Sequence, residues 1–87
     1  MSAWSAQATD AAERCGIVLS SRHWQVLQTL RALYLAQQRH PAMRTLAQAL
    51  RDTHTATTML ELMQLFGERP LRTMSEIAGL PPPPHCL

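Results

Sequence analysis

The penultimate residue of the sequence is a cysteine that follows a run of prolines. Four consecutive prolines, Pro81–Pro84, precede His85 and Cys86. Each proline lacks a backbone N–H and has a fixed φ, so the run predicts an extended polyproline II segment rather than a helix or an inner strand. At about 3.1 Å per residue, the steps from Gly79 to Cys86 span roughly 20 Å, enough to carry a thiol into another protein's active site.

A thiol on such an arm has the chemistry of a sulfur carrier. Its thiolate can attack the outer sulfur of a donor persulfide, and the persulfide then formed on Cys86 can pass that sulfur on. His85 can donate a hydrogen bond to the thiolate, and we expect further activation from the partner's active site. The alternative is an incidental surface cysteine.

The second cysteine and the histidines predict no further reactive site. Cys15 falls at the end of a predicted helix, where the dipole disfavours a thiolate, and is expected to be a buried or half-buried small side chain. In a reducing compartment both cysteines should be thiols, although the sequence leaves a Cys15–Cys86 disulfide open. No C-x-x-C or H-x-x-x-H pair occurs, so we expect no metal and no cofactor.

Composition predicts one small helical domain. The chain has 87 residues, of which 46% are hydrophobic, and few of these are β-branched. That balance favours an all-α fold with a small core. The sequence contains no apolar run long enough for a membrane span and no secretion signal, so we expect a cytoplasmic protein.

The charge is unevenly placed, although the net charge is only +2. Five arginines and no acidic residue lie between Cys15 and Arg51. The planar guanidinium suits carboxylate or phosphate recognition. Arg39, Arg44 and Arg51, together with His85, are therefore candidate residues for docking an anion or an acidic partner, with a solvated surface as the alternative.

The elements that must position the arm are predicted to be five short helices. The apolar spacing places them at about 5–15, 20–38, 41–51, 57–66 and 70–78. Ser20 is the expected N-cap of the second helix, Pro41 the first residue of the third, and Thr55 or Thr57 the start of the fourth. Gly79 should end the fifth. We expect residues 1–79 to form a helical domain and residues 80–87 a flexible C-terminal arm.

The same spacing predicts which side chains face the core. In the second helix these are Val26, Leu27, Leu30, Leu33 and Tyr34; in the third Met43, Leu46, Ala47 and Leu50; in the fourth Met59, Leu62, Met63 and Phe66; and in the fifth Leu71, Met74, Ile77 and Ala78.

Several segments, in this order, resemble the DsrC/TusE family of sulfur-relay proteins. They are GIVLSSRHWQVLQTLRALY, HPAMRTLAQAL and LFGERPLRTMSEIAGLP, followed by further prolines and the penultimate cysteine. The likeness covers about Trp4–Leu87 and is most specific in the tail. It implies a DsrC-like helical bundle, partly helix-turn-helix-like, and sulfur transfer through Cys86 as a sulfurtransferase component rather than as a stand-alone catalyst.

The resemblance is to the single-cysteine branch. In the DsrC branch a second cysteine precedes the terminal one by eleven positions, and here that position is Ser75. A TusE-like role implies an upstream persulfide donor complex, an acceptor such as a tRNA 2-thiouridylase, and proximity to tRNA. The sequence departs from the family in three respects: it lacks the N-terminal hairpin, and it has Pro82 for a lysine and His85 for a small residue.

Three other functions compete with a sulfur carrier. The segments PAMRTLAQALRD and TATTMLELMQLFG could form a helix-turn-helix that binds nucleic acid, or the protein could be a DsrC-like regulator without sulfur transfer. The stretch from Thr57 to Phe66 contains no arginine or asparagine to read base edges, which argues against the first. A small interaction module whose proline arm docks in an aromatic groove would not need the thiol.

Overall fold

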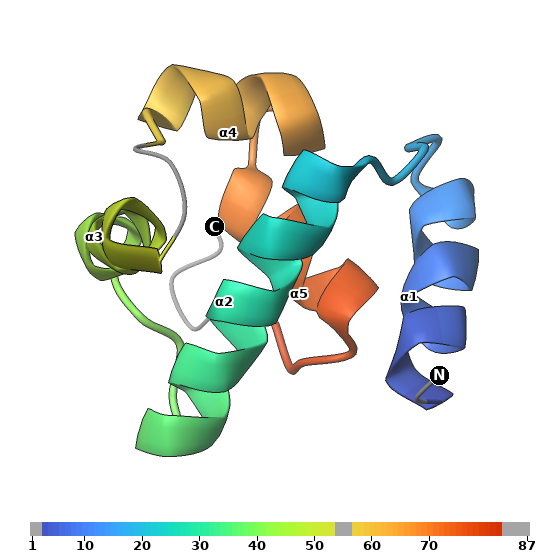
Figure 1. Cartoon of the computed structure of the whole chain (residues 1–87). Coiled ribbons are helices and arrows are strands. Elements are labelled where there is room, and N and C mark those ends of the chain that lie inside the picture. Colours follow the sequence, from blue (N-terminus) through green and yellow to red (C-terminus); the bar gives the residue numbers. More distant parts are fainter. Residues whose placement is uncertain (1–2, 54–56, 83–87) are drawn as a thin grey trace.

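The computed structural model describes residues 3–53 and 57–82, and within them the fold is all-α, as the sequence predicted. The five helices appear in chain order in Figure 1. They are α1 (Ala3–Arg14), α2 (Ser21–Gln37), α3 (Met43–Thr53), α4 (Met59–Phe66) and α5 (Pro70–Ala78).

Helix α5 lies at the centre of the packing. It contacts α1, α2 and α4, and α2 in turn contacts α3 (Figure 1). Met74 and Ile77 of α5 are fully buried, and each such burial contributes about 1.5–3 kcal/mol. The buried hydrophobic core consists of Ala8, Ala11, Ala12, Val26, Leu27, Leu30, Leu46, Leu50, Leu62, Phe66, Met74, Ile77 and Ala78.

Helix α1 packs on α5 through small side chains. Ala8, Ala11 and Ala12 are spaced three and four residues apart, so they share one face, and all three are buried. The helix ends at Arg14, and Gly16 follows it with a φ of 75°, in the left-handed region; Ile17 N donates to Ala12 O at 2.8 Å. The predicted end of this helix is confirmed.

The start of α2 is fixed by the predicted cap. Ser20 Oγ accepts from His23 N, and Ser20 N donates to His23 Nδ1 at 3.0 Å, which completes a capping box. Because Nδ1 accepts, the ring proton is on Nε2, which donates to Leu65 O at 2.9 Å. His23 therefore caps α2 and joins it to α4.

An aromatic pair covers the outer side of this region. Trp24 is half-buried, and its ring lies 5.7 Å from that of Trp4 in an edge-to-face arrangement. The Arg31 guanidinium lies 4.9 Å from the Trp4 ring centroid. Trp24 thus has a packing role.

Two predicted helix starts are wrong. Helix α3 begins at Met43 rather than Pro41, because Pro41 is buried in the preceding connection and Ala42 O accepts the first helical bond from Leu46 N. Helix α4 follows Thr58, whose Oγ1 accepts from Glu61 N, and not Thr57. Thr57 is buried and its hydroxyl accepts from Arg22, which also pairs with Glu61 at 3.1 Å.

The predicted inner face of α4 is only half correct. Leu62 and Phe66 are buried, but Met59 and Met63 are 49% and 38% exposed. The helix has eight residues and packs mainly against α5, so a narrow stripe is enough to cover the contact. In the other helices the predicted core residues are buried or half-buried. No helix in the described ranges is long and apolar enough to cross a membrane.

Candidate functional site

The end of α5 fixes the direction in which the tail leaves the body. Gly79 has a φ of 75°, and Leu80 N donates to Ser75 O at 2.9 Å, so the chain turns sharply after the helix. A Cβ at Gly79 would lie 2.9 Å from Gln7 Nε2, which shows how closely α1 approaches. Leu80 is half-buried and packs against the core. We call residues 79–82 the tail root.

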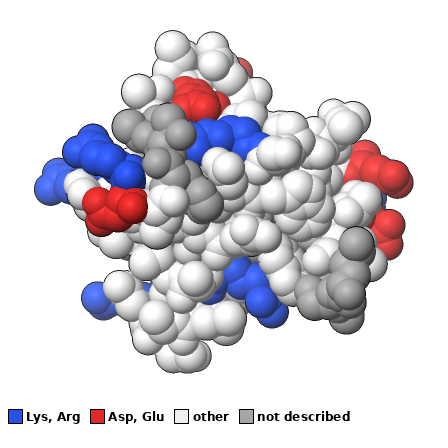
Figure 2. Space-filling view, in the orientation of Figure 1, with Lys and Arg blue, Asp and Glu red and all other residues white. Residues whose placement is uncertain are grey.

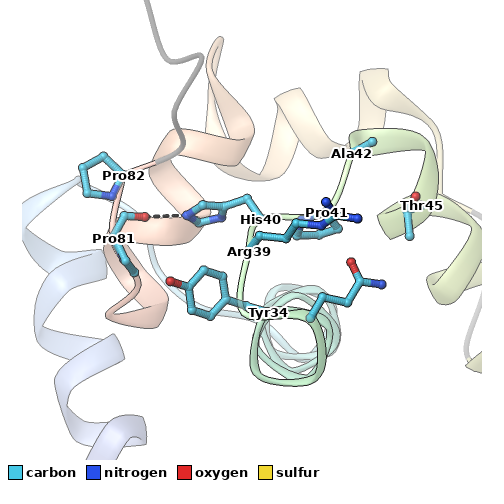
Figure 3. A pocket seen from close by; sticks show the side chains of 9 residues that line it. Tyr34, Arg39, His40, Pro41, Ala42, Thr45, Pro81 and Pro82 are labelled. Atoms are coloured by element: carbon cyan, nitrogen blue, oxygen red, sulfur yellow. Dashed lines mark hydrogen bonds between the residues drawn. The ribbon is translucent and has the colours of Figure 1, made fainter.

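His40 ties the tail root to the connection between α2 and α3. Its Nε2 donates to Pro81 O at 2.6 Å, because a carbonyl oxygen can only accept (Figure 3). The ring lies 5.0 Å from that of Tyr34 and is tilted by 55°. The tail root is therefore held by its own helix and by a residue far away in the sequence.

Ser75 lies beneath this junction. It is fully buried, and its hydroxyl donates to Leu71 O at 2.7 Å. Its Oγ is also 3.5 Å from His40 Nδ1, at the limit of a hydrogen bond. The position at which the resemblance would place a second cysteine thus faces the residue that holds the tail root, and a hydroxyl there cannot form a disulfide.

A cavity of about 560 Å³ opens beside the tail root. Figure 3 shows side chains from α2, the α2–α3 connection, α3 and the tail around it. The lining residues are Tyr34, Gln37, Arg39, His40, Pro41, Ala42, Thr45, Pro81 and Pro82. We call this the tail-root cavity.

The predicted site residues are only partly brought together. Arg39 lines the tail-root cavity, whereas Arg44 and Arg51 are exposed on α3 and do not line it. Cys86 and His85 lie outside the described residues, so their placement and the flexible arm at 80–87 stay predictions.

Sequence reasoning missed the role of His40 and assigned Tyr34 only to packing. The one local signal was a histidine directly before Pro41, at the junction of two predicted helices. Such a junction marks a loop, and loops often carry binding residues. Its partner, Pro81, is far away in the sequence and could not be identified from this signal.

Cys15 has surroundings that disfavour reactivity. It is half-buried, as predicted, and its thiol donates to Glu76 Oε2 at 3.6 Å. Burial and then the Glu76 carboxylate raise its pKa above the usual value, so the thiol stays protonated near neutral pH. Within the described part of the chain, no three histidine, cysteine or acidic side chains are grouped to hold a metal ion.

The chain is similar to proteins of one family. The family described as "DsrC like protein" matches residues 1–87. "Sulfurtransferase TusE" of Sodalis glossinidius is 41% identical over 97% of this chain and 81% of its own length, and the protein of that name from Yersinia pseudotuberculosis is 36% identical over the same shares. The NMR structure of Allochromatium vinosum DsrC matches with a TM-score of 0.77 at 29% identity, covering 92% of this chain and 73% of that one.

Proposed function

Because the chain belongs to the DsrC-like protein family, we propose that it is a sulfur carrier in a persulfide relay, with Cys86 as the residue that carries the sulfur. The pathway we propose is TusE-like, with transfer toward tRNA 2-thiouridine modification. The observation that carries the proposal is a tail root held at a fixed place, from which a proline-rich segment leads to Cys86.

The proposed reaction is a pair of thiol exchanges. The Cys86 thiolate attacks the outer sulfur of a donor Cys–S–SH, the S–S bond of the donor breaks, and the donor cysteine leaves as a thiolate that takes up a proton. The thiolate of an acceptor cysteine then attacks the outer sulfur of the Cys86 persulfide in the same way. No external oxidant or reductant is consumed, because each S–S bond that breaks is replaced by another.

The described residues of the body offer no second site that would compete with Cys86 for sulfur, which is consistent with a carrier role. Cys15 is held as a thiol beside Glu76, and Ser75 cannot close a disulfide. The protein would therefore act as a component that presents Cys86 to a donor and then to an acceptor. We propose residues 1–79 as the body, residues 80–87 as the arm, and the cytoplasm, where thiols stay reduced, as its location.

Mass spectrometry of the intact protein tests the proposal. After incubation with a cysteine desulfurase and L-cysteine, wild type should gain the mass of one sulfur atom, removable by dithiothreitol. Cys86→Ser should gain none, whereas Cys15→Ser, the matched control, should be loaded like wild type. Sulfur found on Cys15, or retained by Cys86→Ser, would contradict the assignment.

The helix-turn-helix alternative gains no support. The relatives bear sulfurtransferase names, and three of the four exposed side chains of α4, the element that would read bases, are apolar: Met59, Leu60 and Met63, with Gln64 as the fourth. Apolar side chains of this kind cannot form the hydrogen bonds that distinguish base pairs.

A further inference from the structure

The tail-root cavity combines apolar walls with polar groups, and none of the described residues that line it is acidic. Pro41, Ala42, Pro81 and Pro82 supply apolar surface. Polar lining comes from Tyr34, Gln37, Arg39, His40 and Thr45. The sequence from Cys15 to Arg51 contains no aspartate or glutamate. This segment forms most of the lining, and its arginines are therefore not neutralised by carboxylates of the same segment.

Arg39 is the arginine in the lining of this cavity, and among the described residues it has no carboxylate partner. The ion pair found within residues 3–53 and 57–82 joins Arg22 to Glu61, and Arg39 takes no part in it. The Arg39 side chain is exposed and is one of the residues that line the cavity (Figure 3). A guanidinium fork in this setting is suited to a planar carboxylate, which it can bind through two parallel hydrogen bonds.

We propose that the tail-root cavity binds a glutamate or aspartate side chain in an acidic peptide segment of a partner protein. Arg39 binds the carboxylate, Gln37 and Thr45 offer further donors, and the Tyr34 ring and the prolines cover the apolar part of the peptide. This inference deepens the proposed carrier function and rests on it for the partner, which would be the donor or acceptor that the tail enters.

Peptide fits these observations better than nucleic acid. A nucleic-acid backbone needs a row of cations to neutralise successive phosphates, whereas the cavity offers one arginine. Arg44 and Arg51 lie on α3, outside the lining. On the face seen in Figure 2, uncharged surface separates the basic side chains in the lower part of the view from those in the upper part.

Binding can be measured without sulfur transfer, in the full-length Cys86→Ser protein labelled with ¹⁵N. The probe is a short capped peptide, acetyl-Ala-Gly-Glu-Leu-Gly-amide, and its control has Gln in place of Glu. We expect amide shifts to concentrate on Gln37, Arg39, His40 and Thr45, and binding at least tenfold weaker for the Gln peptide. Equal binding of both peptides, or shifts centred elsewhere, would overturn the proposal.

A matched pair of charge variants distinguishes binding in the cavity from a general attraction of the acidic peptide to a positively charged protein. In the same background, Arg39→Gln should weaken binding of the Glu peptide about tenfold, as expected for loss of a charge-assisted pair. Arg72→Gln, which removes an exposed charge from α5, outside the cavity lining, should leave it unchanged. Equal losses in the two variants would refute a specific site.

Three further outcomes are decisive. A short single-stranded RNA that displaces the Glu peptide from these residues at lower concentration would overturn the peptide assignment in favour of nucleic acid. If the peptide binds as expected but Cys86 of wild type accepts no sulfur from the desulfurase, the cavity stands and the carrier function fails. If Cys86 is loaded but the peptide does not bind, the cavity assignment alone fails.

Discussion

Two neighbouring residues of α5 face regions of different chemistry. Ser75 is fully buried and lies against His40, which holds Pro81 of the tail root. Glu76 is exposed, and its carboxylate accepts a hydrogen bond from the Cys15 thiol near the end of α1. Successive residues of a helix point about 100° apart, so one turn of α5 serves both regions.

The body holds its own thiol, Cys15, on a different side of α5 from the tail root. On the Glu76 side, burial and a carboxylate raise the pKa of Cys15 and keep it unreactive. On the Ser75 side, hydrogen bonds fix the tail root, and no thiol is present among the described residues there. The tail root is therefore a mechanical anchor, and under our proposal the reactive sulfur is Cys86.

The largest effect that tests this anchor should come from Gly79→Ala. An L-residue at φ 75° costs about 1–2 kcal/mol, and the new Cβ would also lie 2.9 Å from Gln7 Nε2. Gly16→Ala is the matched control, because Gly16 has the same φ but open space around it. Urea denaturation should show at least as large a loss of stability at Gly79, and any excess over Gly16 is the cost of moving Gln7, whose amide is the far end of an exposed side chain. A loss at Gly79 smaller than that at Gly16 would contradict the close contact.

A smaller effect is expected from His40→Ala, which removes the hydrogen bond to Pro81 O. The loss should be about 0.5–1.5 kcal/mol in the free energy of unfolding. The shift of the Leu80 amide in NMR spectra should change at the same time. His40→Gln should recover part of the stability, because its amide N–H can reach the same carbonyl. A Gln variant as unstable as the Ala variant would show that ring packing on Tyr34 matters instead.

The smallest effect concerns the Cys15 side. The folded pKa of Cys15 is raised above 9.0, its ordinary value, which the unfolded chain keeps. Its contribution to stability is therefore complete below pH 9 and is lost as the pH rises through the folded pKa, because the unfolded chain releases the proton first.

Urea denaturation of Cys86→Ser across this pH range should show the decline. Adding Glu76→Gln should make it shallower, because the carboxylate is one cause of the raised pKa. The alkylation of Cys15 by iodoacetamide at pH 8 should also become faster in the double variant, since more thiolate is present. An unchanged slope and rate would leave burial as the sole cause.

Sequence reasoning succeeded where the determinants are local. Ser20 and Gly79 were identified as helix boundaries because a capping side chain or a left-handed residue acts within one helical turn. The buried face of α5 followed from the spacing of Met74, Ile77 and Ala78. The family resemblance was likewise visible, because it lies in the order of residues.

What only the tertiary structure decided depends on residues distant in sequence. Judged from the local sequence, Thr57 and Thr58 could each serve as the N-cap of α4. Thr58 is the N-cap in the structure, because the Thr57 hydroxyl accepts a hydrogen bond from Arg22 of α2. The tail-root cavity exists because Pro81 returns to His40, forty-one residues away. The sequence by itself determined the helices and the tail with its cysteine. Packing decided where that tail is anchored and which arginine lies beside it, since such contacts form only when separate helices meet.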